Sequence, residues 1–200
     1  KCLDAVVTGN YNCGFGKSTL GGTTGSNNSA FGAGSMASNV GGGDNTAFGY
    51  AAGSAINSGA SNVTIGAQGG DALTTGSSNT AVGFRALTTE DTGSRNVAIG
   101  DNALAALNYD GNAYNVAVGY EAGLSVTTGT ANTLIGGLAG DALTTGGFNV
   151  AIGYGALSTE DAHGKNTAIG FQSLASQNAG AEAYNVAIGF EAGKLVSTGI

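Results

Sequence analysis

The chain has 200 residues, of which 38 are glycine and none is proline, and only 10% are charged. A net charge of −7 with six Lys and Arg residues is unfavourable for binding a phosphate backbone, so we expect no nucleic-acid partner. No apolar run approaches the length of a membrane span, and the lack of a strict Gly-X-Y period excludes collagen.

Residues 1–11 precede the regular part of the chain and are predicted to form an N-terminal cap or strand. Cys2 and Cys13 lie close together in sequence at this end. They form either one disulfide, which would indicate an oxidising extracellular setting, or two unlinked buried thiols. The chain begins at Lys1 and stops in mid-coil at Ile200. We therefore expect a processed chain or a piece of a longer one.

From residue 12 onward the pentapeptide Asn-x-Ala-x-Gly and looser copies of it recur, as in Asn96–Gly100. From Asn28 onward the copies follow a 17-residue step, except for two 19-residue steps. A short fixed period is typical of a stack of coils. The segment 12–200 is predicted to form an all-β, parallel β-solenoid (β-roll) of about eleven coils, with two short strands in each coil. The motif asparagines are Asn12, Asn28, Asn45, Asn62, Asn79, Asn96, Asn115, Asn132, Asn149, Asn166 and Asn185.

A second, 70-residue period is superimposed on the first. The segments 71–123 and 141–193 nearly repeat each other. Four coils make up this longer unit, which divides the chain into super-repeats such as 62–131 and 132–200. Duplication of a four-coil cassette explains the pattern.

Positions within a coil are counted from the motif asparagine as 0. Position +1 is mostly Val or Thr, +2 mostly Ala, +3 Ile, Val or Phe, and +4 always Gly. This alternation predicts a strand, for example over 97–99. We expect both strand faces to be packed, with the small side chain at +2 approached by the opposite wall of the coil or by a neighbouring chain. Stacked coils would align the motif asparagines, whose amides could bond along the stack as a ladder.

The acidic residues occupy different positions in neighbouring coils. Glu90 lies at +11 and Asp91 at +12 of one coil, and Asp101 lies at +5 of the next. Like charges would therefore not stack directly between adjacent coils.

Copies such as Asn149–Gly153, Asn166–Gly170 and Asn185–Gly189 resemble the head repeats of trimeric autotransporter adhesins, and similar repeats occur in phage tail-fibre proteins. The resemblance covers about 12–200 of the chain. It implies a left-handed β-roll, three identical chains around one axis, and a place on a cell or virion surface in contact with host surfaces or matrix. The coils of this chain are longer than the roughly 14-residue coils of the adhesin heads, which enlarges a turn.

Aromatic residues recur at position +5, just after the motif glycine. Stacked coils would gather them into a column, which could be an inter-chain packing seam or a strip that stacks sugars. The residues of this aromatic column are Tyr50, Phe84, Tyr120, Tyr154, Phe171 and Phe190.

No Ser-His-Asp, Cys-His or paired-carboxylate pattern recurs at a shared position, so we expect no enzyme activity, metal or cofactor. His163, the single histidine, is interpreted as a solvated turn residue. Pairs such as Thr74-Thr75 raise the possibility of ice binding. Adjacent residues of a strand point to opposite faces, however, which disfavours a flat threonine array.

The sequence thus predicts a non-catalytic extracellular structural fibre or adhesin rod, on a cell surface or in a virion tail fibre. We expect it to self-associate as a homotrimer or an end-to-end filament, and to contact surface glycans or matrix. The alternatives are a phage tail-fibre shaft or a carbohydrate-binding module that uses the aromatic column, with ice binding less favoured.

Overall fold

The computed structural model describes residues 8–178 and 180–198. Within them, each coil contributes one short strand, and the eleven strands form one sheet. The bounds are β1 Cys13–Phe15, β2 Ser29–Phe31, β3 Thr46–Phe48, β4 Val63–Ile65, β5 Thr80–Val82, β6 Val97–Ile99, β7 Val116–Val118, β8 Thr133–Ile135, β9 Val150–Ile152, β10 Thr167–Ile169 and β11 Val186–Ile188.

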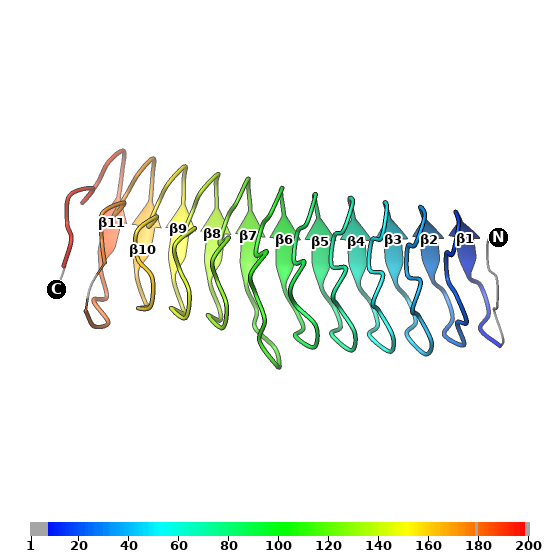
Figure 1. Ribbon diagram of the computed structural model, residues 1–200. Coiled ribbons are helices and arrows are strands. Elements are labelled where there is room, and N and C mark those ends of the chain that lie inside the picture. The colour runs from blue at the N-terminus through cyan, green and yellow to red at the C-terminus, as the bar shows by residue number, and fades with distance from the viewer. Residues whose placement is uncertain (1–7, 179, 199–200) are drawn as a thin grey trace.

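The strands follow one another in chain order from β1 to β11, and every neighbouring pair is parallel (Figure 1). Equivalent motif positions face each other, as in the pairing of Ala81 with Ala98 and of Val82 with Ile99. The predicted parallel β-solenoid is therefore confirmed. Ten steps between eleven strands, at about 4.8 Å each, give a sheet about 48 Å long. No helix in the described part of the chain could cross a membrane.

The sequence pattern predicts two strands per coil, whereas the described coils have one each. The reason lies in the backbone after the strand, where positions +6 and +8 adopt left-handed conformations, as at Arg85 (φ 54°) and Leu87 (φ 55°). Such left-handed non-glycine residues recur in every coil of the described chain. This conformation costs roughly 1–2 kcal/mol per residue and interrupts any second strand. Hydrogen bonds between coils continue through the turns, for example from Asn102 N to Phe84 O.

The invariant glycine at +4 is required by the stack itself. At Gly100 the φ angle is 138°, and a Cβ atom would lie 2.2 Å from the carbonyl oxygen of Gly119 in the next coil. The same close approach joins Gly83 to Gly100 and Gly119 to Gly136. No other residue fits here, because the conformation favours glycine and the neighbouring backbone occupies the space of a side chain.

The side chain at +2 of each strand points into the solenoid. Ala47, Ala81 and Ala98 are fully buried, whereas Phe48 and Ile99, at +3, are 56% and 37% exposed. The opposite wall of the coil, not a neighbouring chain, is therefore what approaches these small side chains. Within the chain only the inward face is packed, and packing of the outward face by a neighbouring chain stays a prediction. The outward face carries the larger side chains, which are β-branched or aromatic.

Alanines at +7, such as Ala52 and Ala86, also belong to the core, and its large side chains alternate between positions +8 and +11. In the coil of Asn45, +8 is Gly53 and +11 is Ile56, and both are buried. In the coil of Asn79, +8 is Leu87 and +11 is Glu90, and both are again buried. A Cβ at Gly53 would lie 2.7 Å from Ile56 Cδ1. The narrow interior thus accepts one large apolar side chain at these two positions in most coils.

Candidate functional site

The motif asparagines lie in one line along the stack and are buried from Asn28 to Asn166. At each of the ten steps the side-chain oxygen accepts a hydrogen bond from the backbone N–H of the next motif asparagine, at 2.9 to 3.2 Å. Direct amide-to-amide bonds join only Asn45 to Asn28 and Asn96 to Asn79 among the described residues. The ladder is therefore mainly one of side chain to backbone.

In most coils the amide nitrogen of the motif asparagine, Nδ2, ties the strand to the turn of its own coil. In 17-residue coils Nδ2 donates to the carbonyl at +14, as from Asn115 to Gly129 at 2.8 Å. The two 19-residue coils place other residues there. Asn96 Nδ2 instead bonds Ser94 O and Asn79 Oδ1, and Asn166 Nδ2 has no partner among the described residues. An aspartate could accept but not donate, which explains the amide.

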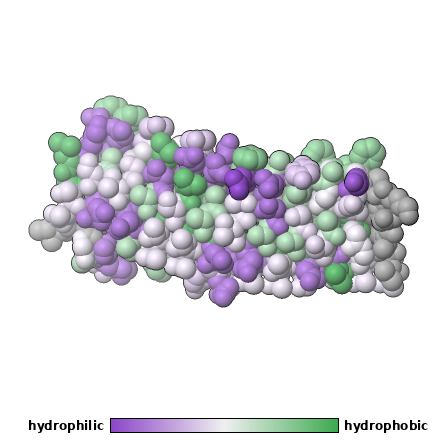
Figure 2. Space-filling model, viewed as in Figure 1, coloured by the Kyte–Doolittle hydropathy of each residue, from purple (hydrophilic) through white to green (hydrophobic). Residues whose placement is uncertain are grey.

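The outward sheet face consists of two adjacent columns, at +1 and +3, without a charged side chain. Position +1 is Val or Thr from β3 to β11, and +3 is Phe, Ile or Val from β1 to β11. Phe31 and Phe48 stack within the +3 column, with ring centroids 5.4 Å apart. We call these two columns the outer face. In the view of Figure 2, hydrophobic and hydrophilic residues are interspersed along the rod.

The aromatic column at +5 borders the outer face. Its six rings are 40 to 74% exposed. Tyr154, Phe171 and Phe190 occupy successive coils and stack with centroids 5.8 and 5.2 Å apart. Tyr50, Phe84 and Tyr120 instead occupy alternate coils, with a smaller residue between them. The column is therefore a continuous stack at one end and an interrupted row elsewhere.

Position −1 borders the other edge of the outer face and carries paired cations and rings. The guanidinium of Arg95 lies 5.5 Å from the ring centre of Tyr114 and donates to its hydroxyl at 2.6 Å. Lys165 repeats the arrangement with Tyr184, at 5.1 Å. An ion pair with Glu182 is the main cause of the raised pKa of Lys165. These pairs follow the four-coil period and make the edge polar at those coils, whereas Phe148 at the same position is 64% exposed.

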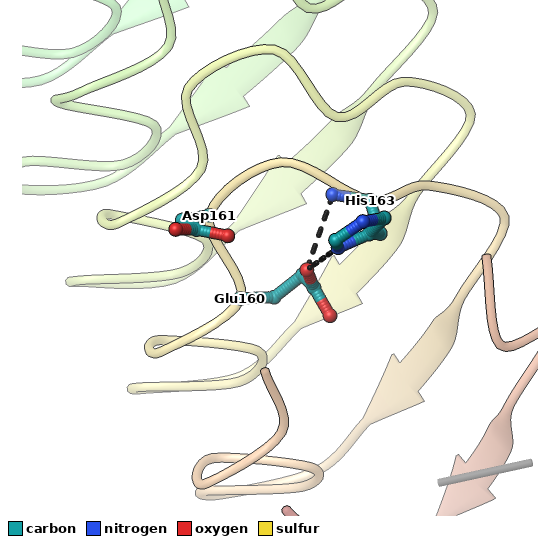
Figure 3. A group of neighbouring side chains, drawn as sticks. All are labelled: Glu160, Asp161 and His163. Carbon is teal, nitrogen blue, oxygen red and sulfur yellow. Dashed lines mark hydrogen bonds and ion pairs between the residues drawn. The ribbon is translucent and has the colours of Figure 1, made fainter. Parts of the chain in front are cut away.

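His163 lies in a turn with Glu160 and Asp161 (Figure 3). One possible ligand atom of each residue lies within 4.8 Å of the others. The oxygens of Glu160 are already engaged, however. Oε1 accepts from the His163 backbone N at 3.1 Å and contacts its ring Nδ1 at 3.2 Å, and Oε2 accepts from Gln177 Nε2 at 3.4 Å. Asp161 points away from this pair in Figure 3. The carboxylate of Glu160 thus caps a turn.

Glu90 occupies the equivalent place in the preceding cassette and is also fully buried. Its two oxygens accept from the backbone N–H groups of Gly93 at 2.6 Å and Tyr109 at 3.2 Å. Burial is the largest cause of its pKa being raised above 4.5. Sequence reasoning missed the burial of both glutamates. Their +11 position, which is apolar in coils such as those of Ile56 and Leu73, was the available signal.

The two cysteines can be placed only in part. Cys13, in β1, is exposed, so the alternative of two buried thiols is wrong for Cys13, and Cys2 lies outside the described residues. The expectation of a Cys2–Cys13 disulfide stays a prediction.

Comparison with protein-family models found no match, and comparisons with curated proteins and with solved structures found none either. The function of the chain must therefore be argued from its own surfaces.

Proposed function

We propose that the chain is a non-catalytic structural rod that associates laterally with copies of itself through its outer face. In this role it forms part of a fibre on a cell or virion surface, where its repetitive surface is presented to the surroundings. The observation that carries the proposal is the absence of any charged side chain from the two outer-face columns over the eleven described strands. Exposed uncharged surface of this extent is typical of an interaction site.

The size of the surface suits a protein partner. The sheet is about 48 Å long, and the seven positions from −1 to +5 span about 20 Å at about 3.3 Å per residue. The product is about 1,000 Å² for one copy. Specific protein complexes bury about 800 Å² per partner. The outer face together with its flanking rows at −1 and +5 is therefore large enough for a stable interface.

A second copy of the chain is the occupant that fits best. A partner must follow the repeat of about 4.8 Å to fill the grooves between side chains in successive coils. Another copy has this repeat by construction, and its own outer face also lacks charges. Charges such as Lys17, Asp44 and Asp101 lie at the flanking positions −1 and +5, where they would form the polar rim of an interface.

The test is the mass of the native assembly. We expect sedimentation velocity to show species that are multiples of 19.2 kDa, and a dimer and a trimer to be distinguished by mass. The double variant Ile99→Lys/Ile135→Lys places two charges on the outer face and should sediment as a monomer. Ser58→Lys/Thr128→Lys adds the same charge in exposed turns and should assemble normally. A monomeric parent chain at high concentration would overturn the proposal.

A role as a phage tail-fibre shaft would use the same self-associating rod, placed on a virion. The carbohydrate-binding alternative is favoured by a separate observation, the exposed rings of the aromatic column. Threonine and valine share the +1 column from β3 to β11, and +3 carries no threonine. An ice-binding surface is therefore the less favoured interpretation, and thermal hysteresis measurements test it.

A further inference from the structure

A shallow groove of about 450 Å³ crosses three successive coils just beyond the aromatic column. Its volume lies in the range of roughly 300–1,000 Å³ that small-molecule sites occupy. Two coil steps span about 10 Å along the rod. The lining includes Arg85, Thr88, Thr89, Asn102, Ala105 and Ser125.

Arg85 is the only charged residue of this lining. Its φ angle of 54° lies in the left-handed region, where an arginine is strained and a glycine is not. The corresponding residue of the next cassette is Gly155, with φ of 60°. The guanidinium has no ion pair or hydrogen bond with any described residue, and it lies 5.9 Å from the ring centre of Phe84. The fold therefore does not require this arginine.

The other polar groups of the groove are also available to a ligand. The side chains of Thr89, Asn102 and Ser125 make no hydrogen bond within the described structure. Thr88 donates its hydroxyl to Asp71 Oδ1 at 2.6 Å, which leaves its oxygen free to accept. A guanidinium, a carboxamide and several hydroxyls thus surround a floor that includes alanine and leucine side chains. Mixed donors and acceptors over small apolar groups suit a ligand rich in hydroxyls.

The surrounding charges decide which hydroxylated ligand fits. Asp71 holds Thr88, Asp101 directly precedes Asn102, and Glu121 lies in the next coil. One arginine against three carboxylates leaves this region negative, which disfavours an anionic ligand. An exposed Phe84 ring beside the guanidinium offers an apolar surface for the C–H face of a sugar.

We propose that this groove binds a neutral saccharide, one to two sugar units long, held by Arg85, Thr89, Asn102 and Ser125 and bordered by the Phe84 ring. The site lies beside the outer face and not within its two columns. Arg85, Thr89, Asn102 and Ser125 lie outside positions −1 to +5 of their coils, so replacing them should affect saccharide binding and not self-association.

The first experiment uses a panel of probes on the full chain. Cellotetraose, mannotetraose and maltotetraose are the neutral probes, and tetragalacturonate is the anionic one. We expect the amide resonances of Arg85, Thr89, Asn102 and Ser125 to shift on titration with at least one neutral probe. Failure of all neutral probes to shift them, or tighter binding of tetragalacturonate, would overturn the proposal.

Variants then assign the binding to the groove. Arg85→Gly copies the next cassette, so it should fold normally and weaken binding at least about tenfold, since hydrogen bonds to charged groups contribute more than neutral ones. Ser125→Ala provides a second test at a partly exposed side chain and should weaken binding less. Gln172→Ala changes the position that corresponds to Asn102 in the next cassette and should leave affinity unchanged. Equal affinity of Arg85→Gly and the parent chain would contradict the assignment, and unchanged sedimentation of Arg85→Gly would show that the effect is not on assembly.

Discussion

Replacing one motif glycine by alanine should break the stack at a defined step. In Gly100→Ala, the new Cβ would lie 2.2 Å from Gly119 O, 2.6 Å from Gly119 C and 3.2 Å from Tyr120 N. All three are backbone atoms of the next coil, so no side chain can rotate away. The φ of 138° costs about 1–3 kcal/mol for a non-glycine residue. Overpacking adds about 1–3 kcal/mol, so we expect a total loss of about 2–6 kcal/mol.

Substitutions at two other glycines separate the cost of the backbone conformation from the cost of overpacking. A Cβ at Gly22 meets no atom within 4 Å but has a φ of 74°, and a Cβ at Gly41 meets no atom within 4 Å and has no left-handed φ. In urea denaturation followed by circular dichroism, Gly41→Ala should be nearly neutral and Gly22→Ala should cost about 1 kcal/mol. Because coils contact only their neighbours, hydrogen exchange in Gly100→Ala should rise most near β6 and β7. A loss in Gly100→Ala no larger than in Gly22→Ala would refute the close-approach argument.

Two further substitutions probe the buried polar groups. Asn115→Asp keeps the acceptor for Asn132 N but loses the donor to Gly129 O. At pH 7 a buried carboxylate would then face a carbonyl oxygen, so the free energy of unfolding should fall by about 3 kcal/mol or more. Burial raises the folded-state pKa of such a carboxyl above the ordinary Asp value of about 4, and protonation restores a donor, so this loss should shrink as the pH falls from 7 toward about 4. Equal losses in urea at pH 7 and pH 4 would contradict this account. For Glu90, burial raises the folded-state pKa above its ordinary value of 4.5. The protonated side chain therefore stabilises the fold at low pH, and this stabilisation is lost as the pH rises from 4.5 toward the folded-state pKa. The stability of the parent chain minus that of Glu90→Gln should therefore fall between pH 4 and pH 7. The pKa of Asp141 is also raised by burial, but Asp141 is present in both proteins and its contribution cancels. A flat difference would show that folding does not raise the pKa of Glu90.

The stacking order and register were predictable because both follow from one repeated spacing. Asn79 and Asn96 are one 17-residue step apart, and their strands pair with motif positions opposed. Once successive units form parallel rungs, the period leaves little choice of partner. The constant glycine at +4 carried the same information, because a Cβ at Gly83 would overlap the backbone of Gly100.

Hydrophobicity alone could not predict which face of the strand points into the solenoid. Ile99 is more apolar than Ala98, yet Ala98 is buried and Ile99 is 37% exposed. The interior is narrow, and the opposite wall already fills it with side chains such as Leu104. The left-handed backbone conformations could not be predicted from the sequence for a different reason. Arg85 and Leu87 carry no local preference for that conformation, and inter-coil hydrogen bonds hold them there.

The two four-coil cassettes show that interior positions vary less in sequence than surface positions. At the interior positions Leu87 and Glu90, the second cassette keeps Leu157 and Glu160, and all four are buried. Where the interior changes, it changes in a coupled way. Leu107 of the first cassette becomes Gln177 in the second, and Gln177 Nε2 donates to Glu160 Oε2 at 3.4 Å.

The surface positions of the groove show no such coupling. Arg85 becomes Gly155, and Leu124 becomes Lys194, without a compensating contact in the first cassette, because Arg85 bonds no described residue. A side chain that can be exchanged freely on a fixed backbone adds little to the fold. The left-handed strain at Arg85 is thus offset by the stacking of the coils and not by a local side-chain partner. A binding site can therefore differ between cassettes while the backbone of the rod stays the same.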